Sequence, residues 1–399
     1  MSIENKWIRA AIPALLIHSC IGSVYCWSLL KGDIAQEMGC TVSQIELAFS
    51  LAIFFLGMSA AFGGRFVERN VKISSLCSTI FFASGLLLSC LSIKLQSIWG
   101  LMISYGGIMG IGLGLGYLSP VKTLMLWFKE HKGLATGIAI SGFGLSKVLF
   151  SPYIEWCNSE YNIYYTLSSM AGISIILMTT TVILIRKPWG WREPKTKFKI
   201  DEYIGIIKNP TYLKIWTIFY LNITCGLALI SFEKSIGQSV GIVGGEIGLL
   251  ASLTALFNTL GRFGYSTVSD WTKRKEIIYV CIFLSSVLVT LLGAAFSYMI
   301  PIIIMLCVIN AGYGGGFSTL PTLLQSKFGM EKISTIHGLA LSAWAWAGLS
   351  GNQLSNLIIE TWHLDYRVLF ITLAVLYLIS LFITNSIPKN NGSKQTEGN

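Results

Sequence analysis

Twelve apolar runs, each long enough to cross a lipid bilayer, follow one another along this 399-residue chain. A transmembrane helix needs about 20 mostly apolar residues, because the hydrocarbon core of a bilayer is about 30 Å thick. The composition agrees, since 53% of the residues are hydrophobic and only 12% are charged. The sequence therefore predicts an all-α integral membrane protein. The expected spans are residues 7–30, 44–64, 73–93, 98–120, 134–157, 163–185, 211–232, 246–268, 276–297, 300–325, 334–358 and 366–387.

One long hydrophilic stretch divides the runs into six and six. The turns after the second span of each half also correspond, because GGRFVERNVK (63–72) and VSDWTKRK (268–275) each combine an acid with several bases. Simple solvation of charge is the alternative explanation of these turns. Repeated halves are typical of transporters with a midplane site between two pseudo-symmetric bundles. We predict a six-helix bundle over 1–186, a cytoplasmic linker over 187–210, a second six-helix bundle over 211–387 and a disordered tail over 388–399.

The basic residues indicate the orientation of the chain. Most Lys and Arg residues lie at the termini or in loops after even-numbered spans, whereas the opposite loops carry only Lys31, Lys94 and Arg367. The positive-inside rule therefore predicts that both termini are cytoplasmic, in a bacterial plasma membrane. This topology explains the net charge of +10 without a nucleic-acid partner. The first apolar segment is expected to remain as the first span, because it is too long for a cleavable signal.

Several function classes find no support in the sequence. The nine cysteines have no metal-ligand spacing, and we interpret them as small core residues. No nucleophile with a base, metal cluster or carboxylate pair stands out, so we expect neither an enzyme nor a cofactor or metal. The glycines of 106–116 and 133–144 favour close helix packing over a phosphate-binding loop, which would need a preceding strand. We expect a chain that can act as a monomer.

Arg262 lies inside an apolar run, eight residues before Asp270 at the end of that span. This spacing puts the side chain roughly 12 Å inside the membrane. A charge at bilayer depth costs about 2.5 to 3.5 kcal/mol, so it is expected to face water, a partner or an anion. A guanidinium pairs both oxygens of a carboxylate, and Asn258, one turn earlier, can add an amide to the same ligand. We predict an anion site; a salt bridge to another helix is the alternative.

Two lysines lie in other apolar runs. Lys147 is about 13 residues into its span and near the midplane, where it could share a substrate with Arg262. Packing of a neutral amine, or a contact with a carbonyl, is the alternative. Lys122 is about six residues from the cytoplasmic end of its span. It could bind the substrate directly or attract anions into an inner vestibule.

Three further polar residues are candidates for entry or coupling. Glu233 and Lys234, near the outer end of the seventh span, could pair with each other, contact headgroups or form a gate. His18, in the middle of the first span, could relay protons or donate a hydrogen bond to a neighbouring helix. Aromatic residues also accompany the buried cations and are candidates for the lining. They are Tyr25, Tyr117, Phe143, Tyr313, Phe317 and Trp344.

Five segments carry a resemblance to a known family. The chain resembles the oxalate/formate antiporter family of the major facilitator superfamily, which is related to the monocarboxylate transporters. The resemblance spans nearly the whole chain and implies the major facilitator fold. The segments are GSVYCW (22–27), GLGLGYLSPVKTLMLWFKEHKGLATGIAISGFGL (112–145), FNTLGRFGYSTVSD (257–270), YGGGFSTLP (313–321) and HGLALSAWAWAGLSG (337–351).

By this resemblance, Arg262 matches the arginine that binds substrate carboxylate. Tyr25 and Tyr117 match positions of an aromatic cage, and Phe143, Tyr313 and Phe317 are aromatic where that cage is aromatic. The oxalate transporter has a second cation, a lysine, where this chain has Trp344. We hypothesise that Lys147 supplies that cation from the other half. Monocarboxylate transporters have an acid where this chain has Asn258.

The sequence as a whole predicts a secondary transporter of a small organic anion, a mono- or dicarboxylate, that works by alternating access and by exchange. A proton-coupled monocarboxylate symporter is the first alternative. A transport-incompetent carboxylate sensor on the same fold is the second. An anion channel is disfavoured, because two six-helix halves without a pore repeat suit a carrier.

Overall fold

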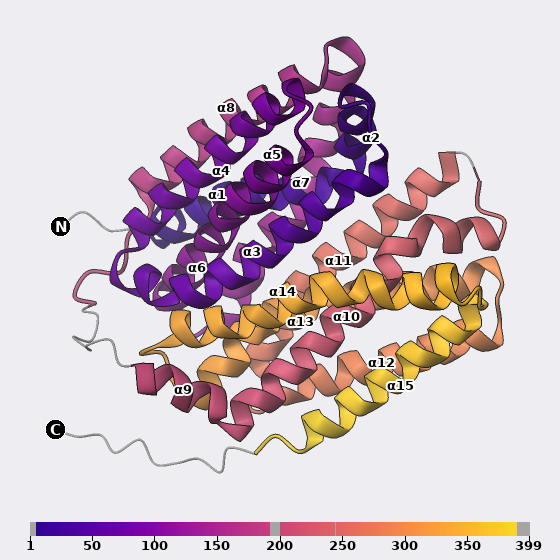
Figure 1. The fold of residues 1–399 in the computed structure, drawn as a ribbon. Helices are drawn as coiled ribbons and strands as arrows, with labels where there is room; N and C mark the ends of the chain where they lie inside the picture. The colour runs from indigo at the N-terminus through magenta and orange to yellow at the C-terminus, as the bar shows by residue number, and fades with distance from the viewer. Residues whose placement is uncertain (1–4, 192–199, 244, 389–399) are drawn as a thin grey trace.

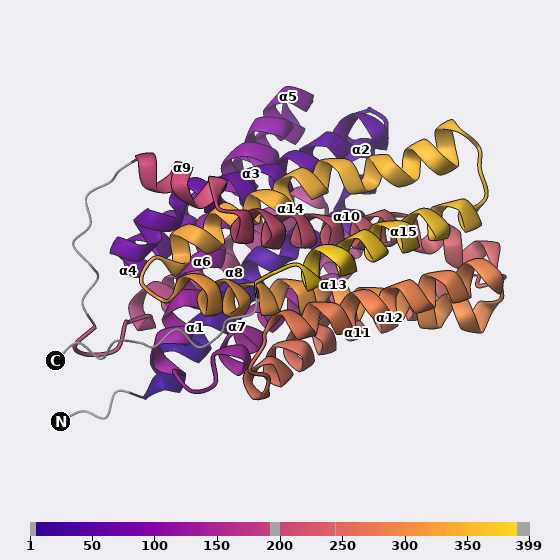
Figure 2. The same cartoon turned by 90° about the horizontal axis from the view of Figure 1, so that it is seen from below.

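The computed structural model describes residues 5–191, 200–243 and 245–388. Over these ranges the chain is helical and forms no strand. Twelve long helical segments of the described chain run side by side in two bundles of six (Figures 1 and 2). This architecture confirms the predicted fold class. Residues 192–199 of the predicted linker, and residues 389–399 of the predicted tail, lie outside the described residues.

The first bundle begins with one continuous helical segment that changes its helical type along its length. Its fourth segment is also composite. The elements of this bundle are η1 (Trp7–Ala11), α1 (Ile12–Ile21), η2 (Gly22–Cys26), α2 (Trp27–Glu37), α3 (Val42–Arg69), α4 (Val71–Lys94), α5 (Ile98–Leu101), η3 (Met102–Met109), α6 (Gly110–Trp127), α7 (Lys132–Glu160) and α8 (Ile163–Leu184).

The second bundle follows a short helix, α9 (Ile200–Lys208), which lies within the predicted linker. The hydropathy pattern did not predict this helix, because it is too short to span a bilayer. The six long segments of the second bundle are α10 (Pro210–Ser239), α11 (Gly245–Trp271), α12 (Glu276–Ala295), α13 (Met299–Phe328), α14 (Ile333–Ser355) with η4 (Asn356–Thr361), and α15 (Tyr366–Asn385).

Local sequence explains where several helices begin. Asn209 caps α10 by accepting hydrogen bonds from the backbone N–H groups of Thr211 and Tyr212, and Pro210 occupies the first turn. Asn162 caps α8 in the same way through Tyr165.

Ten of the described helical segments are long and apolar enough to cross a membrane. The two others, α11 and α14, belong to the same bundle and carry more polar residues, which lower their mean hydropathy.

Glycines bring helices within each bundle into close contact. A Cβ atom at Gly114 of α6 would collide with the carbonyl oxygen of Leu56 on α3. A Cβ atom at Gly112 would lie 2.6 Å from the backbone nitrogen of Phe82 on α4, and the carbonyl oxygen of Gly112 accepts a 2.6 Å hydrogen bond from Ser78. These contacts confirm that the glycines of this region serve helix packing. Gly107 is an exception, because no heavy atom lies within 4 Å of the position that a Cβ atom would occupy there.

The two bundles meet at the end of the molecule that carries both termini. There α3 packs against α14, and α7 packs against α11. Glu68 of α3 accepts hydrogen bonds from the backbone nitrogen and the hydroxyl of Thr335, at 3.0 and 2.9 Å. Asp270 of α11 accepts hydrogen bonds from the backbone nitrogens of Gly133 and Leu134, at 2.6 and 2.8 Å. Each acid therefore binds the N-terminus of a helix in the opposite bundle.

These two contacts give the matching turns a structural role. Glu68 belongs to the 63–72 turn and Asp270 to the 268–275 turn. Each carboxylate is held by the other bundle, so solvated charge does not account for either acid. At the opposite end, near the turn between α2 and α3, the bundles diverge (Figure 1). These contacts therefore hold the two bundles together at the terminal end.

Candidate substrate-binding cavity

A cavity of about 280 Å³ lies between the two bundles. It is lined by residues of η2, α2, α3 and α7 from the first bundle, and of α10, α11 and α13 from the second. Lys31 and Glu46, on either side of the turn between α2 and α3, mark its opening. That turn is at the opposite end of the molecule from both termini (Figure 1). The side chains of Lys31 and Glu46 are both partly exposed, so the cavity reaches the surface near this turn.

Arg262 of α11 lines this cavity, although only 2% of its surface is exposed. Its Nε donates a 2.8 Å hydrogen bond to Oδ1 of Asn258, one turn earlier on the same helix. The guanidinium carbon lies 5.2 Å from the ring centre of Phe317 and 5.9 Å from that of Phe143. No Asp or Glu of the described chain lies within 4 Å of this guanidinium. The alternative of a salt bridge is therefore not what this structure contains.

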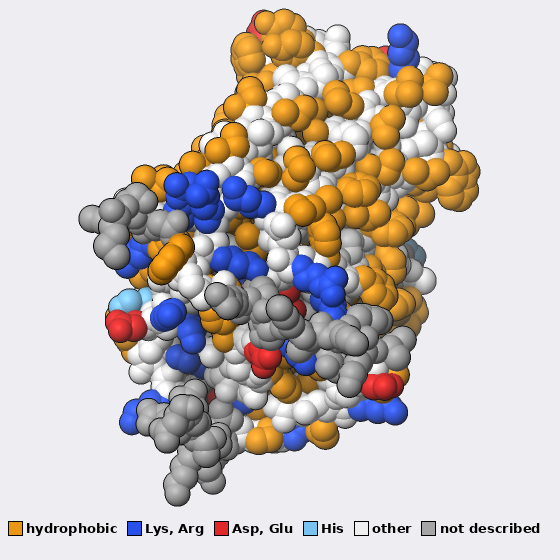
Figure 3. All heavy atoms as spheres, turned by 90° about the vertical axis from the view of Figure 1, so that its left-hand side faces the viewer, with side chains coloured by type: hydrophobic (Ala, Val, Ile, Leu, Met, Phe, Trp, Pro, Cys, Tyr) orange, Lys and Arg blue, Asp and Glu red, His pale blue; other side chains and the backbone are white. Residues whose placement is uncertain are grey.

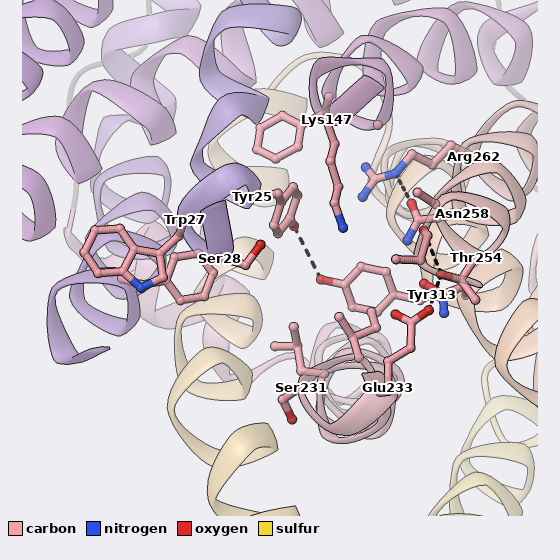
Figure 4. A pocket seen from close by; sticks show the side chains of 18 of the residues that line it. Tyr25, Trp27, Ser28, Lys147, Ser231, Glu233, Thr254, Asn258, Arg262 and Tyr313 are labelled. Carbon is pink, nitrogen blue, oxygen red and sulfur yellow. Dashed lines mark hydrogen bonds between the residues drawn. The ribbon is translucent and has the colours of Figure 1, made fainter. Parts of the chain in front are cut away.

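Polar residues follow one another along the face of α11 that points into the cavity (Figure 4). Thr254, Asn258 and Arg262 are spaced by four residues, which places them on one face of the helix. The Thr254 hydroxyl donates a 2.5 Å hydrogen bond to Oε1 of Glu233 on α10. A row of polar groups therefore extends along the cavity wall from the guanidinium to the carboxylate of Glu233.

Lys147 of α7 approaches the cavity from the other bundle. Its side chain is partly exposed and its ammonium points toward Tyr313 and Asn258 (Figure 4). Among the residues that the structure describes, it forms neither an ion pair nor a hydrogen bond. The ammonium is therefore directed into the cavity, where it can meet a solute. The alternative of a contact with a carbonyl is not found among the described residues.

Three of the predicted aromatic side chains, Tyr25, Phe143 and Tyr313, line the cavity. The hydroxyls of Tyr25 on η2 and Tyr313 on α13 are 3.4 Å apart, so this contact bridges the two bundles. The ring of Tyr25 also contacts that of Phe143 at a centre distance of 5.3 Å. The structure thus brings together the predicted lining residues Tyr25, Phe143, Tyr313, Asn258, Arg262 and Lys147.

Three other predicted residues lie behind this lining. The rings of Phe317 and Trp344 are 4.5 Å apart, and Tyr117 contacts Trp344 at 5.9 Å. The hydroxyl of Tyr117 and Nε1 of Trp344 are buried and have no hydrogen-bond partner among the described residues. Buried polar groups usually have a partner. These two groups are therefore available as hydrogen-bond donors to a solute that reaches them in another conformation.

The remaining candidates lie outside the cavity lining. His18 of α1 is fully buried beside Tyr117, with the two ring centres 5.4 Å apart. Neither imidazole nitrogen has a hydrogen-bond partner among the described residues. Lys122 of α6 is 1% exposed. Lys234 is exposed and does not pair with Glu233, which bonds to Thr254 instead.

Sequence reasoning missed part of the cavity. Glu46 accepts hydrogen bonds from Lys31 at 3.2 Å and from Trp27 Nε1 at 3.4 Å at the cavity opening. An acid inside the second apolar run was a usable signal for this site. Thr254 lies four residues before Asn258, as Asn258 lies before Arg262, so helical periodicity also indicates that it lies on the same face.

In the described part of the chain, no group of three or more His, Cys, Asp or Glu residues could hold a metal ion.

Comparisons with known proteins identify the family and the fold of the chain. A sequence model of the Major Facilitator Superfamily matches residues 14–352. The chain is 25% identical to the uncharacterized MFS-type transporter YhjX of Escherichia coli, with 84% of each chain covered. It is 22% identical to the oxalate:formate antiporter of Oxalobacter formigenes over 96% of this chain and 92% of that protein. The crystal structure of the MFS transporter FucP in the outward conformation superposes with a TM-score of 0.71 at 10% identity, covering 95% of this chain and 98% of that one.

Proposed function

The chain belongs to the major facilitator superfamily, and we propose that it is a secondary transporter that exchanges small organic anions, mono- or dicarboxylates, by alternating access. One observation carries this proposal. Arg262 is buried without a carboxylate partner and faces a cavity that is open at one end. A carboxylate from solution would supply the missing counter-charge through a bidentate pair. The similarity to an oxalate:formate antiporter supports the same class of substrate.

In this proposal each residue around the cavity has a defined role. Arg262 is the primary carboxylate clamp, and Asn258 holds its guanidinium in place through the 2.8 Å hydrogen bond. Lys147 supplies the second positive charge from the opposite bundle. The other residues form the lining and the layer behind it, which would close on the substrate. They are Tyr25, Phe143, Tyr313, Tyr117, Phe317 and Trp344.

The charges that line this cavity support exchange as the mode of transport. A buried charge without a partner costs several kcal/mol in a medium of low dielectric constant. An empty cavity that contains Arg262 and Lys147 should therefore resist closure. Binding of an anion neutralises the site and allows residues 1–186 and 211–387 to move against each other as two bodies. The empty carrier returns slowly, so transport takes the form of anion-for-anion exchange.

We place both termini in the cytoplasm of a bacterial cell, with the chain as a monomer in the plasma membrane. Lys and Arg side chains gather on the face that carries the termini, as the positive-inside rule requires of a cytoplasmic face (Figure 3). With this orientation, the cavity of the present structure opens outward. Lys122, on the closed side, would then contact the anion only in the inward-open conformation, either directly or in the vestibule.

Counterflow in proteoliposomes tests this function. Vesicles loaded with formate, pyruvate, oxalate or malonate are given the same anion in labelled form outside. A carrier shows uptake that is accelerated by internal substrate, whereas a channel follows voltage alone and a sensor moves nothing. Absence of accelerated exchange for every carboxylate would refute the proposal.

A proton-coupled monocarboxylate symporter is the second candidate function. The buried imidazole of His18, which has no partner of normal geometry among the described residues, favours it. An inward pH gradient would then drive net uptake into vesicles that contain no internal anion, which exchange alone does not allow.

A further inference from the structure

Besides the Lys31–Glu46 ion pair, three charged side chains line the cavity, and one of them is an acid. Arg262 and Lys147 come from α11 and α7, and Glu233 comes from α10. A carboxylate beside two cations is unexpected in a site that only attracts anions, since like charges repel. The role inferred for this acid rests on the proposed function and narrows the class of substrate.

Glu233 is held in the cavity wall. Its Oε1 accepts the 2.5 Å hydrogen bond from Thr254 on α11, so its direction is set by the polar face that also carries Asn258 and Arg262. Its carboxylate points toward the cavity in the same view as the ammonium of Lys147 (Figure 4). Neither Arg262 nor Lys147 lies within 4 Å of it. Glu233 therefore adds negative charge to the cavity without forming an ion pair with Arg262 or Lys147.

The other charged groups of the cavity do not change this balance. Lys31 and Glu46 form an ion pair of 3.2 Å at the opening, so together they contribute no net charge. Thr254, Asn258, Asn310 and the aromatic residues of the lining are uncharged. The ionised interior thus holds two positive charges and one negative charge, a net charge of +1.

We propose that Glu233 determines the charge of the transported anion and restricts it to one negative charge, so that the substrate is a monocarboxylate. A monoanion bound to Arg262 leaves Lys147 and Glu233 to balance each other when the bundles close. A dianion leaves one uncompensated negative charge in the closed site, and such a charge is strongly unfavourable at low dielectric constant. The pair of cations alone would favour a dianion, so the acid reverses the preference.

The test compares monoanions with dianions in proteoliposomes. Counterflow of pyruvate and formate is measured against counterflow of oxalate and malonate, at a pH at which both dianions are fully ionised. The wild-type protein should exchange the monoanions faster. Glu233→Gln raises the net charge of the interior to +2, so a dianion no longer leaves an uncompensated negative charge. The dianion-to-monoanion rate ratio should rise by about tenfold or more, because an uncompensated buried charge costs more free energy than a tenfold change in rate represents.

Three variants separate charge from structure. Glu233→Asp keeps the charge and should keep the wild-type ratio. Glu155→Gln removes an exposed acid of α7 outside the cavity lining and should also keep it. Lys147→Gln gives a net charge of zero and should slow both anion classes. Lys147→Gln combined with Glu233→Gln restores +1 through Arg262 alone and should recover monoanion exchange by about tenfold over Lys147→Gln.

The outcomes distinguish this inference from the proposed function. If no carboxylate exchanges in the wild-type protein, the proposed function fails. If carboxylates exchange but Glu233→Gln leaves the dianion-to-monoanion ratio unchanged, or slows both classes equally, the inference about Glu233 is overturned while the function stands. A wild-type protein that already prefers dianions overturns it too. Should Glu233→Gln fail to fold, Lys147→Gln decides instead, and monoanion exchange by that variant at the wild-type rate overturns the inference.

Discussion

Glu68 and Thr335, which are 267 residues apart in the sequence, are joined by two hydrogen bonds to one carboxylate. The contact links the end of α3 to the first turn of α14 and closes the molecule on the side of the termini. Asp270 makes the corresponding contact with Gly133 and Leu134 at the start of α7. The two halves thus use the same device twice, and both contacts must break when the molecule opens at that end.

Removal of one of these carboxylates should open the closed end. Glu68→Ala deletes two hydrogen bonds to a charged acceptor, each with a net value of about 1.5 to 3 kcal/mol. We expect a shift of tenfold or more toward the conformation open at the terminal end. Spin labels at Lys129 and Glu331, exposed on opposite bundles, should report a longer distance. Asp201→Ala, which removes an exposed acid of α9, is the matched control. An unchanged spin-label distance in Glu68→Ala would show that the Glu68–Thr335 contact does not hold this end closed.

Glycines between the bundles should control the conformation, and glycines within a bundle should control stability. A Cβ at Gly133 would collide with the carbonyl oxygen of Ser266 in the other bundle, whereas a Cβ at Gly261 would collide with Ala311 of the same bundle. Gly133→Ala should therefore shift the spin-label distance with little change in Tm. Gly261→Ala should lower stability by about 1 to 3 kcal/mol.

Gly172→Ala serves as the control for both glycine variants, because no heavy atom lies within 4 Å of the added methyl group. Thermal unfolding in detergent and the spin-label distance are measured on all three proteins. If Gly133→Ala and Gly261→Ala changed the Tm and the spin-label distance to the same extent, contacts between the bundles would have no separate effect on conformation.

An acid introduced beside Arg262 should compete with the substrate. Asn258→Asp places a carboxylate where Oδ1 already accepts the 2.8 Å hydrogen bond from Nε, so the guanidinium gains an internal counter-charge. The concentration of anion that gives half-maximal exchange should rise about 10- to 100-fold, which corresponds to a charge-assisted hydrogen bond of 1.5 to 3 kcal/mol. Asn258→Leu removes the hydrogen bond without adding charge and should have a smaller effect. Equal effects of the two substitutions would mean that the charge is irrelevant.

Tyr117 offers a test of the residues behind the lining. Its buried hydroxyl has no partner in the described structure and does not line the open cavity. We expect the Tyr117 hydroxyl to donate a hydrogen bond to the anion when the bundles close. Tyr117→Phe should therefore lower the maximal exchange rate by about tenfold, which corresponds to the free energy of one hydrogen bond. The half-saturating concentration should change little, and Tm should not fall, because an unpaired buried hydroxyl is removed. A loss of Tm at a normal rate would instead make this hydroxyl a packing element.

Much of this architecture could be predicted from the sequence, because hydropathy sets the length of each span and helical spacing sets its faces. The proximity of Asn258 to Arg262 follows from their four-residue separation. The depth of Arg262 follows from its distance to Asp270. Both inferences use only the geometry of one helix.

Contacts between helices could not be predicted in the same way. The hydroxyls of Tyr25 and Tyr313 meet across 288 residues, and this depends on how the two bundles pack. Tyr117 and Trp344 are aromatic residues inside apolar runs, as several lining residues are, but they pack behind Phe143 and Phe317 in this conformation. Periodicity identifies the face of a helix and does not specify which residues on that face reach the cavity.

The most direct measurement is carboxylate counterflow by Arg262→Gln in proteoliposomes, with Arg262→Lys beside it and thermal unfolding as the check on folding. The guanidinium is proposed as the clamp, so Arg262→Gln should fold with a Tm near that of the wild-type protein and lose exchange by about 100-fold or more, since a buried anion left without its partner costs about 3 to 5 kcal/mol. Arg262→Lys should keep part of the activity, because it retains the charge without the planar fork. Exchange by Arg262→Gln at a rate close to wild type would contradict the account.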